Sequence, residues 1–167
     1  MKKLVVALLI SFILPVIALA APEMPGIDGS NAYAVIQSLV NTGIKKPKTQ
    51  HIDGGFQWTA DPVSLGGAMV SYDIKANEDH EICSATFTLA GKDNGYLWFV
   101  STFPFDSADK DASGDFVKEH MAGENASLTI GDALFEMMPS KNGAVLKISD
   151  VDAAAYYDEL LNAKLGL

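Results

Sequence analysis

The chain has 167 residues, and its 21 acidic and 12 basic residues give a formal net charge of −9 at pH 7. All 12 basic residues are Lys, so no guanidinium group is present to grip phosphate or carboxylate through two parallel hydrogen bonds. This composition argues against nucleic acid and anionic lipid as partners, and it favours cations and basic proteins.

The first 20 residues have the pattern of a bacterial export signal. Two lysines precede an apolar stretch at residues 4–17, and Ala18-Leu19-Ala20 supplies the small residues of a cleavage site. The stretch is too short for a stable membrane span. We therefore predict cleavage after Ala20 and a periplasmic or secreted protein with no membrane anchor. Loss of the two lysines changes the formal net charge to −11.

The remaining residues, 21–167, have the length of one domain. Cys83 is the single cysteine of the sequence, so the fold is expected to have no internal disulfide bond. The Pro- and Gly-rich residues 21–29 are expected to form a loose lead-in. A helix is then predicted, with Ser30 as its N-cap and Gly43 at its end, because apolar residues between them recur at helical spacing.

Residues 45–55 are polar and are predicted to be a connector. The alternation of apolar and polar residues then predicts strands at 56–60, 68–75 and 81–90. Asn94-Gly95 suits a hairpin turn, and residues 96–103, apolar on both faces, are predicted to be a central strand.

The second half begins with a short helix predicted near residues 112–122. Strands are expected at 126–130, 133–138 and 144–148, and a last helix is expected to open at Ser149. The predicted fold is a single α+β domain. It has a mainly antiparallel, meander-rich sheet of about six to seven strands, and three helices pack on one face.

One segment resembles a metal-binding loop. Asp109, Asp111, Ser113 and Gly114 match the start of an EF-hand calcium loop, and Asp115 adds a further carboxylate. Position 12 of that loop needs a bidentate Glu, but His120 stands there. Helix-start chemistry explains the same residues, because Asp and Ser cap helices and acidic groups favour helix N-termini. We predict a turn and a capped helix here, with calcium as the alternative and no other cofactor.

The aromatic residues lie mostly at core spacing. Trp58 and Trp98 are candidates for lining a ligand groove, since Trp is rarely buried completely. Cys83 is predicted to point into the core with Phe87 and Leu89, where its thiol would be neutral and inert.

No catalytic motif in the sequence exceeds chance expectation. The sequence therefore predicts a non-enzymatic, exported binding protein of the inhibitor or immunity type, whose acidic surface meets a basic protein partner. A calcium-stabilised domain and a small hydrolase without a visible motif remain as alternatives. The sequence specifies neither the identity of the partner nor the oligomeric state.

Overall fold

The computed structural model describes residues 23–91, 95–103, 105, 110–121, 125–140 and 142–165. The predicted signal peptide lies outside these residues. Among the helices of the described ranges, none has the length and apolar character required to cross a membrane.

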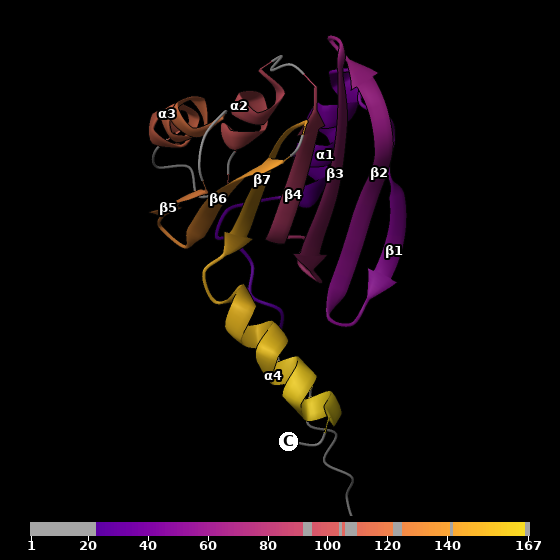
Figure 1. Ribbon diagram of the computed structural model, residues 1–167. Helices are drawn as coiled ribbons and strands as arrows, with labels where there is room; N and C mark the ends of the chain where they lie inside the picture. Colours follow the sequence, from indigo (N-terminus) through magenta and orange to yellow (C-terminus); the bar gives the residue numbers. More distant parts are fainter. Residues whose placement is uncertain are drawn as a thin grey trace, which may run out of the picture.

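The strands of the described chain form one antiparallel sheet in the order β1-β2-β3-β4-β7-β6-β5 (Figure 1). Their bounds are β1 (Lys48–Ile52), β2 (Gly55–Leu65), β3 (Ala68–Asn77), β4 (Ile82–Ala90), β5 (Ala126–Ile130), β6 (Ala133–Ser140) and β7 (Gly143–Asp150). Strands β1 to β4 form one meander and β5 to β7 a second. The two meet where β4 pairs with β7. The predicted α+β class with an antiparallel, meander-rich sheet is confirmed.

The helices are α1 (Ala32–Asn41), α2 (Tyr96–Ser101), α3 (Lys110–His120) and α4 (Ala153–Leu165). Buried side chains of α1, α2 and α3, such as Leu39, Leu97 and Val117, belong to the same hydrophobic cluster as Phe87 of the sheet. Helix α4 instead extends away from one end of the sheet (Figure 1). The last of the three helices predicted to cover one face therefore packs elsewhere.

Alternation along the central strands separates a core face from an open face. On β3, Val70, Tyr72 and Ile74 are buried, whereas Asp73 and Lys75 between and after them are partly exposed. The alternation predicted for this strand is confirmed. Strands β4, β6 and β7 show the same pattern, so partly exposed polar side chains line up on the open face.

Residues 96–103 were predicted to be a strand, and this prediction is wrong. Tyr96–Ser101 forms helix α2, preceded by Gly95 in the left-handed region at φ 78°. A short run that is apolar on all sides fits a buried helix as well as a buried strand, so its period could not decide between them. Of the predicted Asn94-Gly95 turn, Asn94 lies outside the described residues.

The polar connector predicted at 45–55 contains strand β1 and the β1–β2 turn. All but one of the residues of β1 are exposed, and the strand is held by its antiparallel pairing with β2. An edge strand of this kind has no buried side and shows no apolar alternation. The cap of α1 also differs from the prediction, because the Asn31 side chain accepts the Ala34 N–H and Ser30 does not cap the helix.

Cys83 does not lie with Phe87 and Leu89 as predicted. The β3–β4 register shifts between the Lys75–Ser84 pair and the Ala76–Ile82 pair, so Cys83 is the extra residue of a bulge. Its buried side chain belongs to a second small cluster with Met24 and Tyr156. In the described part of the predicted lead-in, Met24 and Ile27 are fully buried.

Candidate functional site

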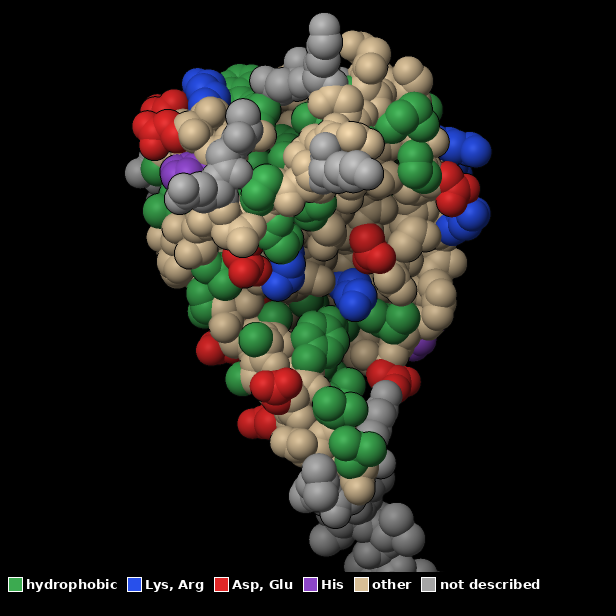
Figure 2. Space-filling model, viewed as in Figure 1, with side chains coloured by type: hydrophobic (Ala, Val, Ile, Leu, Met, Phe, Trp, Pro, Cys, Tyr) green, Lys and Arg blue, Asp and Glu red, His purple; other side chains and the backbone are tan. Residues whose placement is uncertain are grey.

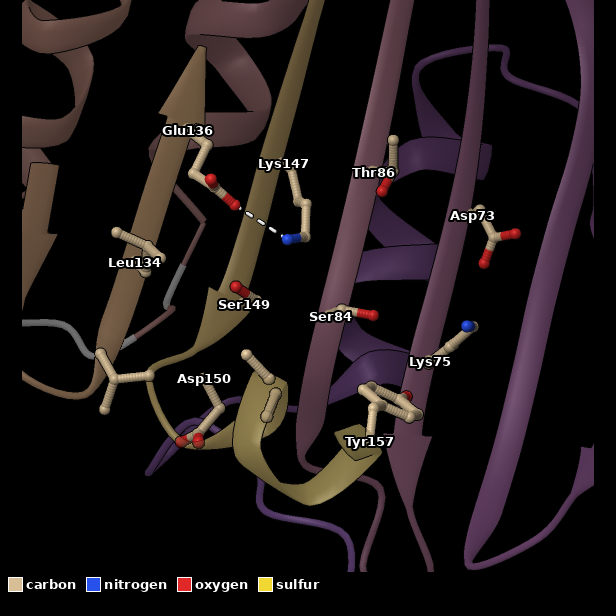
Figure 3. A pocket seen from close by; sticks show the side chains of 13 residues that line it. Asp73, Lys75, Ser84, Thr86, Leu134, Glu136, Lys147, Ser149, Asp150 and Tyr157 are labelled. Atoms are coloured by element: carbon tan, nitrogen blue, oxygen red, sulfur yellow. Dashed lines mark hydrogen bonds and ion pairs between the residues drawn. The ribbon is translucent and has the colours of Figure 1, made fainter. Parts of the chain in front are cut away.

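A groove with a volume of about 460 Å³ lies on the open face beside the first turns of α4 (Figure 3). Strands β3, β4, β6 and β7 form its floor, and the start of α4 forms one wall. The lining residues are Asp73, Lys75, Ser84, Thr86, Leu134, Glu136, Lys147, Ser149, Asp150, Val151, Ala153, Ala154 and Tyr157.

Strand register brings these residues together from distant parts of the chain. In one row across the sheet, Lys75 pairs with Ser84 and Ser84 pairs with Ser149. The next row joins Asp73, Thr86, Lys147 and Glu136 in the same way. Because residues opposite each other on adjacent strands point to the same side, each row presents its side chains to the groove.

The carboxylates on the groove floor already have partners. Glu136 Oε2 lies 2.8 Å from Lys147 Nζ. Both carboxylate oxygens of Asp73 accept hydrogen bonds from Gln57 Nε2, at 3.0 and 2.8 Å. The acceptor capacity of these two groups is therefore partly used inside the protein.

Lys75 has a different environment. Its Nζ lies 5.3 Å from the centre of the Tyr157 ring, in a cation–π contact. No ion pair to Lys75 occurs among the described residues. The Tyr157 hydroxyl donates to Met24 Sδ at 3.4 Å, and burial raises the pKa of this phenol to about 12. The ring of Tyr157 is thus fixed as a wall beside the ammonium group.

Three hydroxyl groups line the groove floor, those of Ser84, Thr86 and Ser149. Within the part of the chain that the structure describes, none of the three hydroxyls has a protein hydrogen-bond partner. Ser149 is only 5% exposed, although its hydroxyl opens onto the groove. These hydroxyls can therefore bind a ligand or water, but none is paired with a base in the way that activates a nucleophile.

Asp150 closes the groove at the end of β7. It is 6% exposed, and its Oδ1 accepts the Asp152 N–H at 2.8 Å. Burial raises the pKa of this carboxyl above its ordinary value of 3.8, and backbone hydrogen bonds oppose that shift. The group stabilises the turn into α4 at an electrostatic cost.

A second surface, which we call the acidic end, is formed by the segments that meet at the end of the sheet where α4 begins. These segments are 23–30, 53–54, 78–81, 131–132 and 150–159. They contain no Lys, and they carry the acidic residues Glu23, Asp28, Asp53, Glu78, Asp79, Glu81, Asp132, Asp150, Asp152, Asp158 and Glu159. In Figure 2 the lysines visible among the described residues lie in the groove and on the upper part of the molecule. Charge is thus segregated along the sheet.

An aromatic group borders the acidic end. Tyr33 is 51% exposed, and its ring contacts His80 and Trp58 with centroid distances of 4.6 and 5.5 Å. His80 holds the left-handed conformation at φ 68°, and its carbonyl accepts the Ala32 N–H at the start of α1. Nearby, His51 Nε2 lies 3.3 Å from Glu78 Oε1, and this pair extends the aromatic group along the surface.

The segment predicted as a helix start forms helix α3 from Lys110 onward, so the predicted helix is confirmed. Asp111 and Ser113 lie within the helix and are not its caps, and the predicted turn before it lies outside the described residues. Asp109 lies outside the described residues. Asp111 is in the exposed first turn, Asp115 pairs with Lys118, and the buried Ser113 hydroxyl donates to the Ser101 carbonyl at 2.8 Å. Among the described residues, no group of three or more His, Cys, Asp or Glu side chains is placed to hold a metal ion.

The structure does not bring Trp58 and Trp98 together. Trp58 is 2% exposed, and its ring neighbours are Tyr33, Phe56 and His80. Trp98 is 39% exposed on α2, beneath Lys118 at 5.3 Å. Neither indole lines the groove on the open face, but Trp58 lines a separate pocket of about 390 Å³ together with Tyr33 of α1.

Sequence reasoning missed the groove residues as a site. Their one visible signal was the alternation that turned Asp73, Lys75, Ser84 and Thr86 away from the core. Nothing in the sequence indicated which residues of β7 would stand beside them, because that depends on the pairing of β4 with β7.

Comparisons of the chain with models of protein families, with curated proteins and with solved structures found no significant match.

Proposed function

We propose that this protein is an exported, non-enzymatic binding protein whose acidic end recognises a basic protein partner. The observation that carries the proposal is the segregation of charge, because the five segments of the acidic end carry many carboxylates and no Lys. Charge of one sign gathered on one surface steers the encounter with an oppositely charged partner.

The aromatic border of this end supports the proposal. Tyr33 is half exposed but is held by its contacts with His80 and Trp58, so it loses little conformational freedom on binding. Fixed Tyr side chains surrounded by polar groups are typical anchors of protein interfaces. The acidic groups would set the rate of encounter, and Tyr33 would contribute to the lifetime of the complex.

A matched pair of triple variants tests the role of the acidic end. The first variant carries Glu23→Gln, Asp79→Asn and Asp158→Asn, and the control carries Asp111→Asn, Asp115→Asn and Glu119→Gln on α3. Both remove the same formal charge. A partner is captured from periplasmic extract, identified and purified, and its association rate is measured at low and high salt. We expect the first variant to slow association at low salt more than the control does. High salt should remove most of the difference, because exposed charges are screened beyond about 8–10 Å.

The proposal fails if the captured partner is acidic, if its association rate is independent of salt, or if the two triple variants slow association equally. Tyr33→Ala separates the two contributions, since it should shorten the lifetime of the complex and leave the association rate nearly unchanged.

Export is tested separately. Mass spectrometry of the protein from the periplasm or medium should show Ala21 as the first residue, or Pro22 if cleavage occurs one position later. An intact Met1 in that fraction would contradict the predicted export signal.

A further inference from the structure

We propose that the groove on the open face is a binding site for a small organic anion, specifically a carboxylate that carries an apolar group. The groove borders the acidic end and shares the start of α4 with it, but the residues that would hold the charged group of the ligand lie on β3, β4 and β7. Lys75 and three hydroxyls in the groove can donate hydrogen bonds, while Glu136 and Asp73 each already accept from a side chain of the protein.

The donors surround one position on the sheet. Lys75 stands on β3 and Lys147 on β7, with Ser84 and Thr86 of β4 between them (Figure 3). Two strand spacings separate β3 from β7, which is about 10 Å. A carboxylate above β4 is therefore within reach of both flexible ammonium groups and of the hydroxyls below it.

Ser149 supplies an independent observation. Ser149 is 5% exposed, and its hydroxyl has no protein hydrogen-bond partner among the described residues. The hydroxyl lines the groove beside Ser84 and is not one of the buried polar atoms left without a partner, so solvent reaches it. It can therefore donate to an anion in the groove in place of water.

The wall formed by α4 selects for an apolar group on the ligand. Leu134, Val151, Ala154 and the ring of Tyr157 line that side of the groove. The volume of about 460 Å³ falls within the range of small-molecule sites, about 300–1,000 Å³. The geometry thus places the charged head of the ligand over β4 and its apolar part against α4.

Three carboxylates near the groove have partners within the protein, although only the charge of Glu136 is opposed by an ion pair with Lys. Glu136 is paired with Lys147, Asp73 accepts from Gln57, and Asp150 accepts the Asp152 N–H. Lys75 has no carboxylate partner in the described chain, so its positive charge is not neutralised by an ion pair. The acidic surface repels anions at long range, but this repulsion is screened at physiological salt.

Binding is tested with three probes of equal chain length: hexanoate, hexanol and hexylamine. Each is titrated into the full mature protein in the millimolar range, which suits ligands of this size, and amide chemical shifts are followed by NMR. We expect saturable shifts at Lys75, Ser84, Thr86 and Lys147 with hexanoate, and much weaker effects with the neutral and cationic probes.

Variants locate the site. Lys75→Met keeps the apolar stem and removes the charge, and it should weaken hexanoate binding by about tenfold, the effect of one charge-assisted hydrogen bond. Ser149→Ala should weaken it severalfold. Lys45→Met, an exposed lysine outside the groove, should leave it unchanged. Amide spectra of each free variant confirm its fold, and Ser84→Ala replaces Lys75→Met if that variant does not fold.

The inference is overturned if hexanol or hexylamine binds as tightly as hexanoate, or if no saturable shift occurs. It is also overturned if Lys75→Met binds hexanoate like the wild type, or if the shifts map to the exposed leucines of α4, Leu161 and Leu165, instead of the groove.

Discussion

The Ser30 hydroxyl accepts the backbone N–H of Ile82 at 2.7 Å and donates to the Ile27 carbonyl at 2.6 Å. Ser30 is 6% exposed and Ile82 is fully buried, so water cannot replace either bond easily. One side chain therefore fixes the segment before α1 to the beginning of β4.

Ser30→Ala should lower the free energy of unfolding by about 1–3 kcal/mol, because it leaves the buried Ile82 N–H without its partner. The Ile27 carbonyl keeps the backbone N–H of Ser30 at 3.1 Å. Denaturant titration measures the change. Ser38→Ala is the matched control, since the Ser38 hydroxyl bonds to a carbonyl within its own helix, and it should change stability by less than about 0.5 kcal/mol. Equal losses in both variants would contradict the importance of the Ser30–Ile82 bond.

Cys83 should be unreactive in the folded protein. Its side chain is completely buried, and burial raises the pKa of the thiol to about 12. The thiolate that reacts with disulfide reagents is therefore scarce at pH 8. Labelling with a thiol reagent should be slow in buffer and fast in denaturant. Rapid stoichiometric labelling of the native protein would show that Cys83 is accessible.

Asp150→Asn should gain stability relative to the wild type as the pH rises. Burial raises the pKa of Asp150 above 3.8, so the folded chain holds this proton more tightly than the unfolded chain does. Between pH 3.8 and the raised pKa, the stability contributed by Asp150 therefore falls as the pH rises. The amide of Asn can still accept the Asp152 N–H but carries no charge.

The measurement is the difference in the free energy of unfolding between the variant and the wild type at several pH values. The difference should be constant below pH 3.8 and should then grow in favour of the variant until the raised pKa is passed. Asp61→Asn is the control with the opposite trend, because the hydrogen bond and charge of Lys48 lower the pKa of Asp61. Parallel trends in the two variants would contradict the shift assigned to Asp150.

Asp111→Ala should lower the melting temperature slightly, and by the same amount with calcium or with chelator. Asp111 stands in the first turn of α3, where a carboxylate contributes about 0.3–1 kcal/mol through the helix dipole. If the segment were a calcium loop, free calcium at a hundred times its dissociation constant would instead raise the free energy of unfolding by about 2.7 kcal/mol. A rise of several degrees in millimolar calcium, lost in Asp111→Ala, would restore the calcium alternative.

Gly114→Ala should change the fluorescence of Trp98. A Cβ atom at position 114 would lie 2.8 Å from Trp98 Nε1, so the partly exposed indole must move. Ala gains about 1 kcal/mol of helix propensity over Gly, which offsets part of the cost of this displacement. We expect a shifted emission maximum with a small change in stability. An unchanged spectrum would show that α2 and α3 do not pack this closely.

Local patterns predicted most of the strands, but they failed where tertiary structure decides the outcome. Alternation was sufficient for Val70 and Ile74, because one side of β3 is buried along its whole length. It failed at Tyr96–Ser101, where a short apolar run becomes a helix, and at β1, which is held by pairing and not by burial. The site was less predictable, since Lys75 and Lys147 come to the same face only through the register of three strands, β3, β4 and β7.

The strand order also has a consequence for how the chain folds. Within each meander, neighbouring strands form hairpins closed by short turns. Strands β4 and β7 instead pair from Ala90–Gly143 at one end to Ser84–Ser149 at the other, so their paired residues are more than fifty positions apart in the sequence. Closing so long a loop costs conformational entropy before any hydrogen bond forms. We therefore expect the two meanders to form early and independently, and the joining of β4 to β7 to be the slow step. The groove crosses the junction between β4 and β7, so we expect the proposed ligand site to be completed only when the two meanders join.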